Sequence, residues 1–153
     1  MNKIISGGQT GVDRAALDAA LELGIECGGY CPKGRKSEDG IIPEKYPLTE
    51  TATDQYPERT ELNVKEGDGT LVIIHKEADK GTSLTISLCR RYRKPCIVID
   101  LSKENIEKAV LNWLTENNIA VLNVAGNRES FSPGINKKTF NFLMRIFQRD
   151  IVV

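Results

Sequence analysis

A glycine-rich turn between a short apolar strand and a helix constrains the fold of this chain most. The segment Ser6-Gly7-Gly8-Gln9-Thr10-Gly11 begins at the end of the expected strand over 3–6 and precedes an Ala- and Leu-rich pattern over 12–23. Glycine lets a backbone turn tightly and approach a ligand closely, because it has no Cβ. The start of the following helix offers unpaired N–H groups and the positive end of its dipole. We therefore predict a strand-to-helix turn that binds an anion, typically a phosphate group.

Alternation of apolar runs and helical patterns continues along the 153 residues. We expect further strands over 25–30, 70–75, 96–100 and 119–124, and helices over 57–64, 82–92, 103–117 and 133–148. The runs 70–75 and 96–100 are typical of strands buried on both faces of a sheet. Strands that alternate with helices become parallel and are joined by right-handed crossovers. The sequence therefore predicts an α/β fold, a Rossmann-like doubly wound parallel sheet in three α/β/α layers, with residues 1–153 in a single domain.

The stretch 31–56 shows no clear pattern, because Pro32, Pro43 and Pro47 interrupt it. So long an irregular segment in a compact domain is usually functional or flexible. It contains the basic run Lys33-Gly34-Arg35-Lys36, which fits either a solvated loop or a lid over an anionic ligand. The sequence leaves open whether this loop closes over the site.

Three turns of the chain follow strands and precede helices, and each is rich in small or polar residues. In open α/β sheets, ligands bind beyond the carboxyl ends of the strands, where such turns meet. The arginine of the third turn suits phosphate, because its planar fork donates two parallel hydrogen bonds. The candidate binding residues are, in the first turn, Gly7, Gly8, Gln9, Thr10, Gly11, Asp13 and Arg14, in the second Gly81, Thr82, Ser83 and Thr85, and in the third Gly126, Arg128, Glu129 and Ser130.

Helix capping is the competing explanation for several of these residues. Thr10 could cap the helix over 12–23, with Asp13 three residues on, and Ser132 could cap the last helix. Arg128 could equally pair with Glu129 or lie exposed. The first turn matches neither the Gly-x-Gly-x-x-Gly dinucleotide pattern nor a Walker loop. The motif therefore indicates an anion without naming the ligand.

Charge and hydropathy narrow the function classes. The chain has 21 basic and 21 acidic residues, without the basic excess typical of a nucleic-acid binder. No apolar run approaches the roughly 20 residues of a membrane span, and the N-terminus lacks the apolar core of a signal peptide. We therefore expect a cytoplasmic protein with neither nucleic acid nor a membrane as partner. His75 is the single histidine and no His/Cys/Asp cluster has metal-ligand spacing, so we predict no metal site and identify no catalytic residue.

Residues 4–20, with the motif Gly8-Gln9-Thr10-Gly11-Val12-Asp13, resemble the opening of the molybdenum cofactor carrier family. The similarity continues over 28–35, 46–51, 58–64, 81–85 and 125–130. The resemblance implies a Rossmann-like fold, a site at the glycine turns, and homo-oligomers. Carriers of this family bind molybdenum cofactor (molybdopterin), a phosphate-bearing pterin dithiolene, and protect and transfer it rather than transform it. Molybdoenzymes are the implied recipients.

This family is similar to a wider Rossmann-like group that includes lysine-decarboxylase-like phosphoribohydrolases and nucleotide-sensing domains. The hydrolases carry a Gly-Gly-x-Gly-Thr-x-x-Glu pattern at the second turn, whereas Thr85 stands here where the Glu would be. Without that carboxylate the usual acid/base role is unfilled, although Asp13 or Glu129 could substitute. We therefore favour a carrier or binding protein over an enzyme. A phosphoribohydrolase-like enzyme and a nucleotide sensor stay as alternatives.

Overall fold

The central sheet has five parallel strands in the order β2-β1-β9-β7-β8. The structure is a computed structural model, which describes the backbone of residues 1–151 and the side chains of residues 1–148. The strands are β1 (Lys3–Ile5), β2 (Glu26–Gly28), β7 (Gly69–Ile74), β8 (Cys96–Asp100) and β9 (Val121–Gly126). In the register, Ile5 of β1 lies opposite Asn123 of β9, which lies opposite Thr70 of β7. The two central strands β9 and β7 therefore carry most of the buried apolar positions of the sheet.

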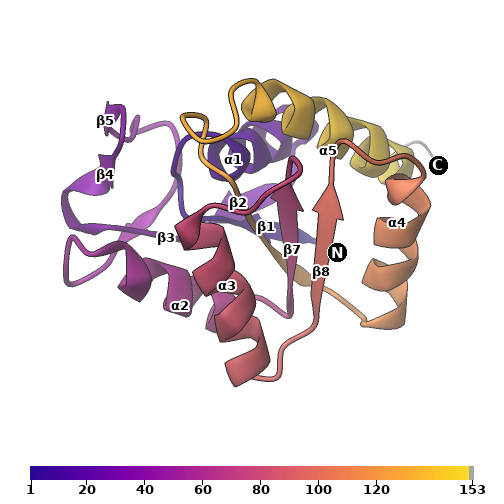
Figure 1. Ribbon diagram of the computed structural model, residues 1–153, viewed down its shortest axis with the longest axis horizontal. Helices are drawn as coiled ribbons and strands as arrows, with labels where there is room; N and C mark the ends of the chain where they lie inside the picture. Colours follow the sequence, from indigo (N-terminus) through magenta and orange to yellow (C-terminus); the bar gives the residue numbers. More distant parts are fainter. Residues whose placement is uncertain (152–153) are drawn as a thin grey trace.

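Helices cover both faces of this sheet (Figure 1). They are α1 (Val12–Leu23), α2 (Tyr56–Glu66), α3 (Lys80–Arg91), α4 (Ile106–Glu116) and α5 (Ile135–Ile151). The main core lies between the sheet and the helices α1, α4 and α5, where Phe142 and Leu143 are fully buried. A smaller cluster around Val64 and Leu88 packs α2 and α3 on the opposite face. The predicted three-layer, doubly wound architecture is thus confirmed.

Local signals set the ends of two helices. Helix α1 covers the predicted residues 12–23 and ends at Gly24, which adopts the left-handed conformation with φ of 69°. Helix α3 begins at Lys80, earlier than predicted, because the Asp79 carboxylate accepts a hydrogen bond from the amide of Thr82 (2.8 Å). The segment 81–85 therefore lies inside the first turns of α3, and the connecting turn is 75–79.

Two predicted strands differ in the structure. The run 96–100 was predicted to be buried on both faces, but β8 is an edge strand and Val98 is 44% exposed. The run 25–30 divides at Gly29 into β2 and β3 (Tyr30–Cys31), which pairs with β6 (Thr49–Glu50) outside the main sheet. Both differences depend on which strand lies beside which, and an apolar run alone does not specify that.

The stretch 31–56 is built from short elements. It contains a 3₁₀ turn (Lys33–Arg35), the antiparallel hairpin of β4 (Lys36–Ser37) and β5 (Gly40–Ile41), and β6. Ile42 and Tyr46 pack on Leu17 of α1, and the Tyr46 hydroxyl donates a hydrogen bond to Asp18 (2.7 Å). Arg35 donates hydrogen bonds to three main-chain carbonyls of the same stretch. The loop is therefore held against α1 by its own core contacts.

The strand order creates a switch point at the carboxyl edge of the sheet. The crossover from β1 leads outward to β2, whereas the crossover from β7 leads outward to β8 in the opposite direction. Strand β9 lies between β1 and β7. The turns that follow these three strands therefore meet at one place, which is where α/β sheets bind ligands. None of the helices within residues 1–151 combines the length and the apolar character that crossing a bilayer would need.

Candidate functional site

A cavity of about 410 Å³ opens at this switch point, between the first turns of α2 and α3 and the turn after β9. We call it the candidate pocket. Its lining includes three cationic and two aromatic side chains, which are Arg59, Lys80 and Arg128, and Tyr56 and Phe131. Ser130 and Gly81 line it as well, so the second and third predicted turns both contribute.

Arg59 is the least ordinary member of the pocket lining, because it is 92% removed from solvent, with 8% exposure. Its Nη1 donates a hydrogen bond to Asp13 Oδ2 (3.1 Å), and the two side chains form an ion pair. Its Nε has no hydrogen-bond partner among the described residues. Buried polar atoms are almost always paired, so an unpaired Nε on an arginine that lines a cavity is exceptional.

Asp13 lies behind Arg59 and is 3% exposed. Burial raises the pKa of its carboxyl, against the opposing effects of Arg59 and of the Gln9 amide, which donates to Oδ2 (3.3 Å). Asp79 raises the pKa of Asp13 further, and Arg128 lowers it. The pair therefore concentrates charge at the switch point while keeping it out of water.

Tyr56 and Phe131 form the aromatic wall of the pocket. The Arg128 guanidinium lies 4.4 Å from the centroid of the Tyr56 ring, and the Lys36 Nζ lies 4.9 Å from it. Phe131 is 47% exposed at the pocket rim. A planar ligand ring could stack on such surfaces, since aromatic and guanidinium planes favour offset stacking.

Asp79 joins the second and third turns. One carboxylate oxygen accepts the Thr82 amide (2.8 Å) and the other accepts the Arg128 amide (2.9 Å). The Asp79 amide in turn donates to the side chain of Asn127 (3.0 Å). Asp79 therefore positions the backbone that carries Arg128, and both of its oxygens are committed to main-chain amides.

The glycines of the first turn are covered by the protein itself. A Cβ on Gly7 would overlap the Arg59 guanidinium, and a Cβ on Gly8 would overlap the Leu48 side chain. Gly8 also has φ of 75°, a conformation that other residues rarely adopt. The absence of side chains here lets Arg59 and residue 48 approach the turn. The first turn therefore supports the candidate pocket from behind.

Two further glycines allow the turns to pack on one another. A Cβ on Gly11 would overlap the backbone of Asn127, and one on Gly126 would overlap the backbone of Ile73 and the side chain of Val12. Gly126, predicted as a binding residue, thus serves the close approach of β9 to β7 and α1.

The polar residues of the first turn contact the β4–β5 hairpin. Gln9 donates a hydrogen bond to the Lys36 carbonyl (2.9 Å), and Arg14 pairs with Asp39. The Thr10 hydroxyl donates to Glu38 and accepts the amide of residue 129 (3.2 Å). The prediction that Thr10 caps α1 is wrong, because Gly11 stands at that position and no side chain caps it.

The remaining candidates of the second turn lie away from the pocket. Thr82 is buried and donates to the Asn127 side chain (3.3 Å), and Thr85 donates to the Gly81 carbonyl (3.1 Å). Ser83 is exposed and does not line the pocket. Gly81 is the only one of the four predicted residues in this described turn that lines the pocket.

The third turn divides its residues between two tasks. Arg128 and Ser130 line the pocket. Glu129 instead accepts the amides of Gly134 (2.6 Å) and Asn136 (3.0 Å) at the start of α5. The prediction that Ser132 caps α5 is therefore wrong, since Glu129 has that role. Among the described residues, Arg128 forms no ion pair with Glu129.

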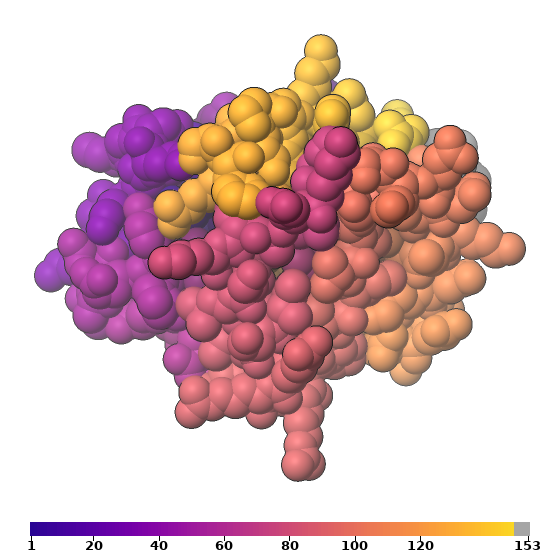
Figure 2. Space-filling view, in the orientation of Figure 1, coloured from indigo at the N-terminus to yellow at the C-terminus, as the bar shows by residue number. Residues whose placement is uncertain are grey.

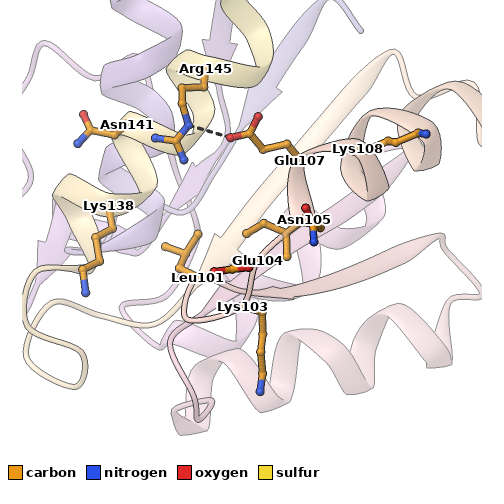
Figure 3. A pocket seen from close by; sticks show the side chains of 10 residues that line it. Leu101, Lys103, Glu104, Asn105, Glu107, Lys108, Lys138, Asn141 and Arg145 are labelled. Atoms are coloured by element: carbon orange, nitrogen blue, oxygen red, sulfur yellow. Dashed lines mark hydrogen bonds and ion pairs between the residues drawn. The ribbon is translucent and has the colours of Figure 1, made fainter.

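A larger hollow of about 870 Å³ lies between α4 and α5 (Figure 3). The Arg145–Glu107 ion pair (2.8 Å) bridges these two helices at the hollow, and Lys103 and Lys138 extend away from its centre. Within the described residues, its lining mixes acidic and basic side chains and contains no aromatic one. Its size alone therefore does not make it a binding site, and the candidate pocket has the more specific chemistry.

Sequence reasoning missed several pocket residues. Arg59 stands in the helix predicted over 57–64, which was given no functional role, and Tyr56 ends the irregular stretch 31–56. Phe131 lies in the third turn but was not among its candidate residues. For Asp79 a signal was available, because an Asp three residues before Thr82 fits a helix N-cap. For Arg59 only its packing against Asp13 reveals its position. Among the side chains of residues 1–148, no three His, Cys, Asp or Glu gather in a way that could hold a metal ion.

Comparison with known proteins agrees with this architecture. The chain matches the family model of the circularly permutated YpsA SLOG family over residues 4–147. It is 46% identical to the "Putative molybdenum carrier protein" of Syntrophus aciditrophicus, whose crystal structure superposes with a TM-score of 0.90. That match covers 96% of this chain and 94% of the other. A search of curated proteins found no match. Because the family match spans nearly the whole chain, the protein belongs to the circularly permutated YpsA SLOG family.

Proposed function

We propose that this protein binds and carries a phosphate-bearing small molecule in the candidate pocket, and that the molecule is molybdenum cofactor. The observation that carries the proposal is the buried Arg59, which lines the same cavity as Arg128 and Lys80 and whose Nε has no hydrogen-bond partner among the described residues. The "Putative molybdenum carrier protein" at 46% identity supports this choice of ligand.

The phosphate would lie among the cations at the start of α3. The first amides of a helix have no intrahelical acceptor, and the helix dipole favours an anion there. Gly81 presents this backbone to the pocket without a side chain. Arg128 can donate two hydrogen bonds to one phosphate group. The first-turn glycines contribute indirectly, because they allow Arg59 to reach this position.

The planar pterin would lie against the aromatic wall. The Arg128 guanidinium, which lies over the Tyr56 ring, and the exposed Phe131 ring offer planar groups on which the pterin would stack. Such a pocket distinguishes a flat, phosphorylated molecule from free phosphate through its stacking contacts. A carrier needs this complementarity without a group that attacks the ligand. Both oxygens of Asp79, the acid in the pocket lining, accept main-chain amides.

The biological setting belongs to the same proposal. The carrier would protect the cofactor in the cytoplasm and deliver it to molybdoenzymes, acting as a homo-oligomer. Size-exclusion chromatography with light scattering tests the oligomer. Transfer to an apo-molybdoenzyme, measured as recovered activity of the recipient, tests delivery.

Native mass spectrometry tests the ligand. We expect wild-type protein, purified anaerobically from a host that makes molybdenum cofactor, to carry a pterin-sized adduct. The Arg128→Met variant should lose it, whereas Arg145→Met, which changes an arginine of the α4–α5 hollow, should retain it. Retention by Arg128→Met would exclude the candidate pocket. A nucleotide adduct would favour the sensor, and cleavage of added nucleotide would favour a phosphoribohydrolase-like enzyme.

A further inference from the structure

The tip of the β4–β5 hairpin places a carboxylate on the predicted anion-binding turns. Glu38 Oε1 accepts hydrogen bonds from the Thr10 hydroxyl and from the Ser130 amide (3.3 Å). Its Oε2 accepts the Ser130 hydroxyl (2.6 Å). The side chain thus collects donors from the turn after β1 and the turn after β9. Figure 2 shows the hairpin segment and the third turn meeting on one face of the molecule.

These donors form an anion subsite that is filled from within the chain. Burial by itself would raise the pKa of Glu38, but the hydrogen bonds from Ser130 and Thr10, with the nearby Arg128 charge, lower it below its usual range. The group is therefore an ionised acceptor at neutral pH. Hydroxyl and amide donors that suit a carboxylate also suit a phosphate oxygen.

The subsite borders the candidate pocket. Ser130 lines the candidate pocket on one side and, with Glu38 and Thr10, a second cavity of about 770 Å³ on the other. An anion held by Arg128 therefore has Ser130 as its neighbour in the pocket lining. Because Glu38 is exposed at a hairpin tip, moving it does not uncover the main core.

We propose that Glu38 is an internal anion which occupies a second anion subsite, made by Thr10 and Ser130, and which a phosphate-bearing ligand displaces when it binds. This inference rests on the proposed function, because it concerns an extension of the same pocket. It assigns the ligand an anionic group that reaches past Arg128 toward the hairpin. It also makes the hairpin a competitor for the ligand.

Calorimetric titration with inorganic pyrophosphate tests this competition. Removing the Glu38 carboxylate should increase the affinity for pyrophosphate, because the ligand no longer has to displace this carboxylate from the subsite. We expect Glu38→Gln to bind pyrophosphate about tenfold more tightly than wild type. Asp39→Asn removes one charge from the same hairpin and leaves Glu38 in place, so it should change affinity less than about twofold.

Hydrogen exchange supplies a second readout. Pyrophosphate should speed exchange of amides 36–41 in the wild-type protein, since displacement frees the hairpin. The inference would be overturned if wild type and Glu38→Gln bound pyrophosphate with equal affinity, or if Glu38→Gln and Asp39→Asn gained equally in affinity. The proposed function would stand in both cases, provided that Arg128→Met weakens pyrophosphate binding. Absence of pyrophosphate binding in all variants would overturn the inference. Unchanged binding in Arg128→Met would place the anion outside the candidate pocket and would overturn the proposed function together with the inference.

Discussion

Arg59 and Asp13 form a buried ion pair at the switch point of the sheet. Neither is more than 8% exposed, and their partner atoms lie 3.1 Å apart. Breaking a buried pair by removing one partner is costly, because it leaves an uncompensated charge away from water. The pair therefore has to be intact for the switch point to fold as it does.

We expect Arg59→Met to lower the free energy of unfolding by about 3–5 kcal/mol near neutral pH. The loss should shrink at about pH 5, because Asp13 without its partner takes up a proton. The sign follows from the two main effects on the pKa of Asp13 in the folded state: burial raises it and the Arg59 charge opposes that rise. Without Arg59 the folded-state pKa rises further, so the variant gains stability relative to wild type as pH falls.

Urea unfolding at both pH values measures this effect. Arg145→Met is the matched control, since it breaks the more exposed pair with Glu107 and should cost less than about 1 kcal/mol at either pH. A cost for Arg59→Met that stays the same at both pH values would contradict the role of Asp13.

At the scale of elements, one carboxylate connects α3 to the turn after β9. Asp79 caps the helix through Thr82 and holds the amide of Arg128. Glu129 does the same for α5, through Gly134 and Asn136. Acidic caps therefore fix the ends of the helices around the pocket, and they also set where the third turn runs.

We expect Asp79→Ala to lower the free energy of unfolding by about 1–2 kcal/mol, because the α3 cap is lost. Hydrogen exchange should become faster both at amides 80–82 and at amides 127–130, which belong to different elements. Asp100→Ala is the control, because this carboxylate also accepts main-chain amides, of Lys76 and Ser102, but away from the pocket. Faster exchange confined to the start of α3 would show that Asp79 is only a helix cap.

For the whole molecule, ligand binding and folding stability are linked. A ligand that binds only the folded state stabilises it by about 2.7 kcal/mol when its concentration is about one hundred times its Kd. The candidate pocket is built from α2, α3 and the third turn, which unfolding separates. Its ligand should therefore stabilise the fold as a unit.

Thermal denaturation with increasing pyrophosphate should raise the Tm of the wild-type protein, and added salt should reduce the gain because the contacts are ionic. Arg128→Met should respond less, whereas Arg145→Met should respond like wild type. Equal responses of the two variants would place the anion outside the candidate pocket. Homo-oligomer formation stays a prediction, which light scattering in the same buffers will test.

The sequence by itself determined the features that depend on neighbours along the chain. The helix at 12–23, its end at Gly24 and the strand–helix alternation follow from periodicity and local backbone preference, and the structure confirms them. The meeting of the first and third turns was also predictable, because the carboxyl ends of parallel strands share one edge. The anion preference of these turns was inferred in the same way and stays a prediction.

Only the tertiary structure decided which side chains line the pocket. Arg59 meets Asp13 across 46 residues of sequence, and Glu38 meets Ser130 across 92. Strand order made 96–100 an exposed edge, although its apolar run resembled a buried strand. These contacts arise when β9 lies between β1 and β7 and brings distant segments together. Local propensity carries no information about such pairings, because their energy exists only after the sheet has formed.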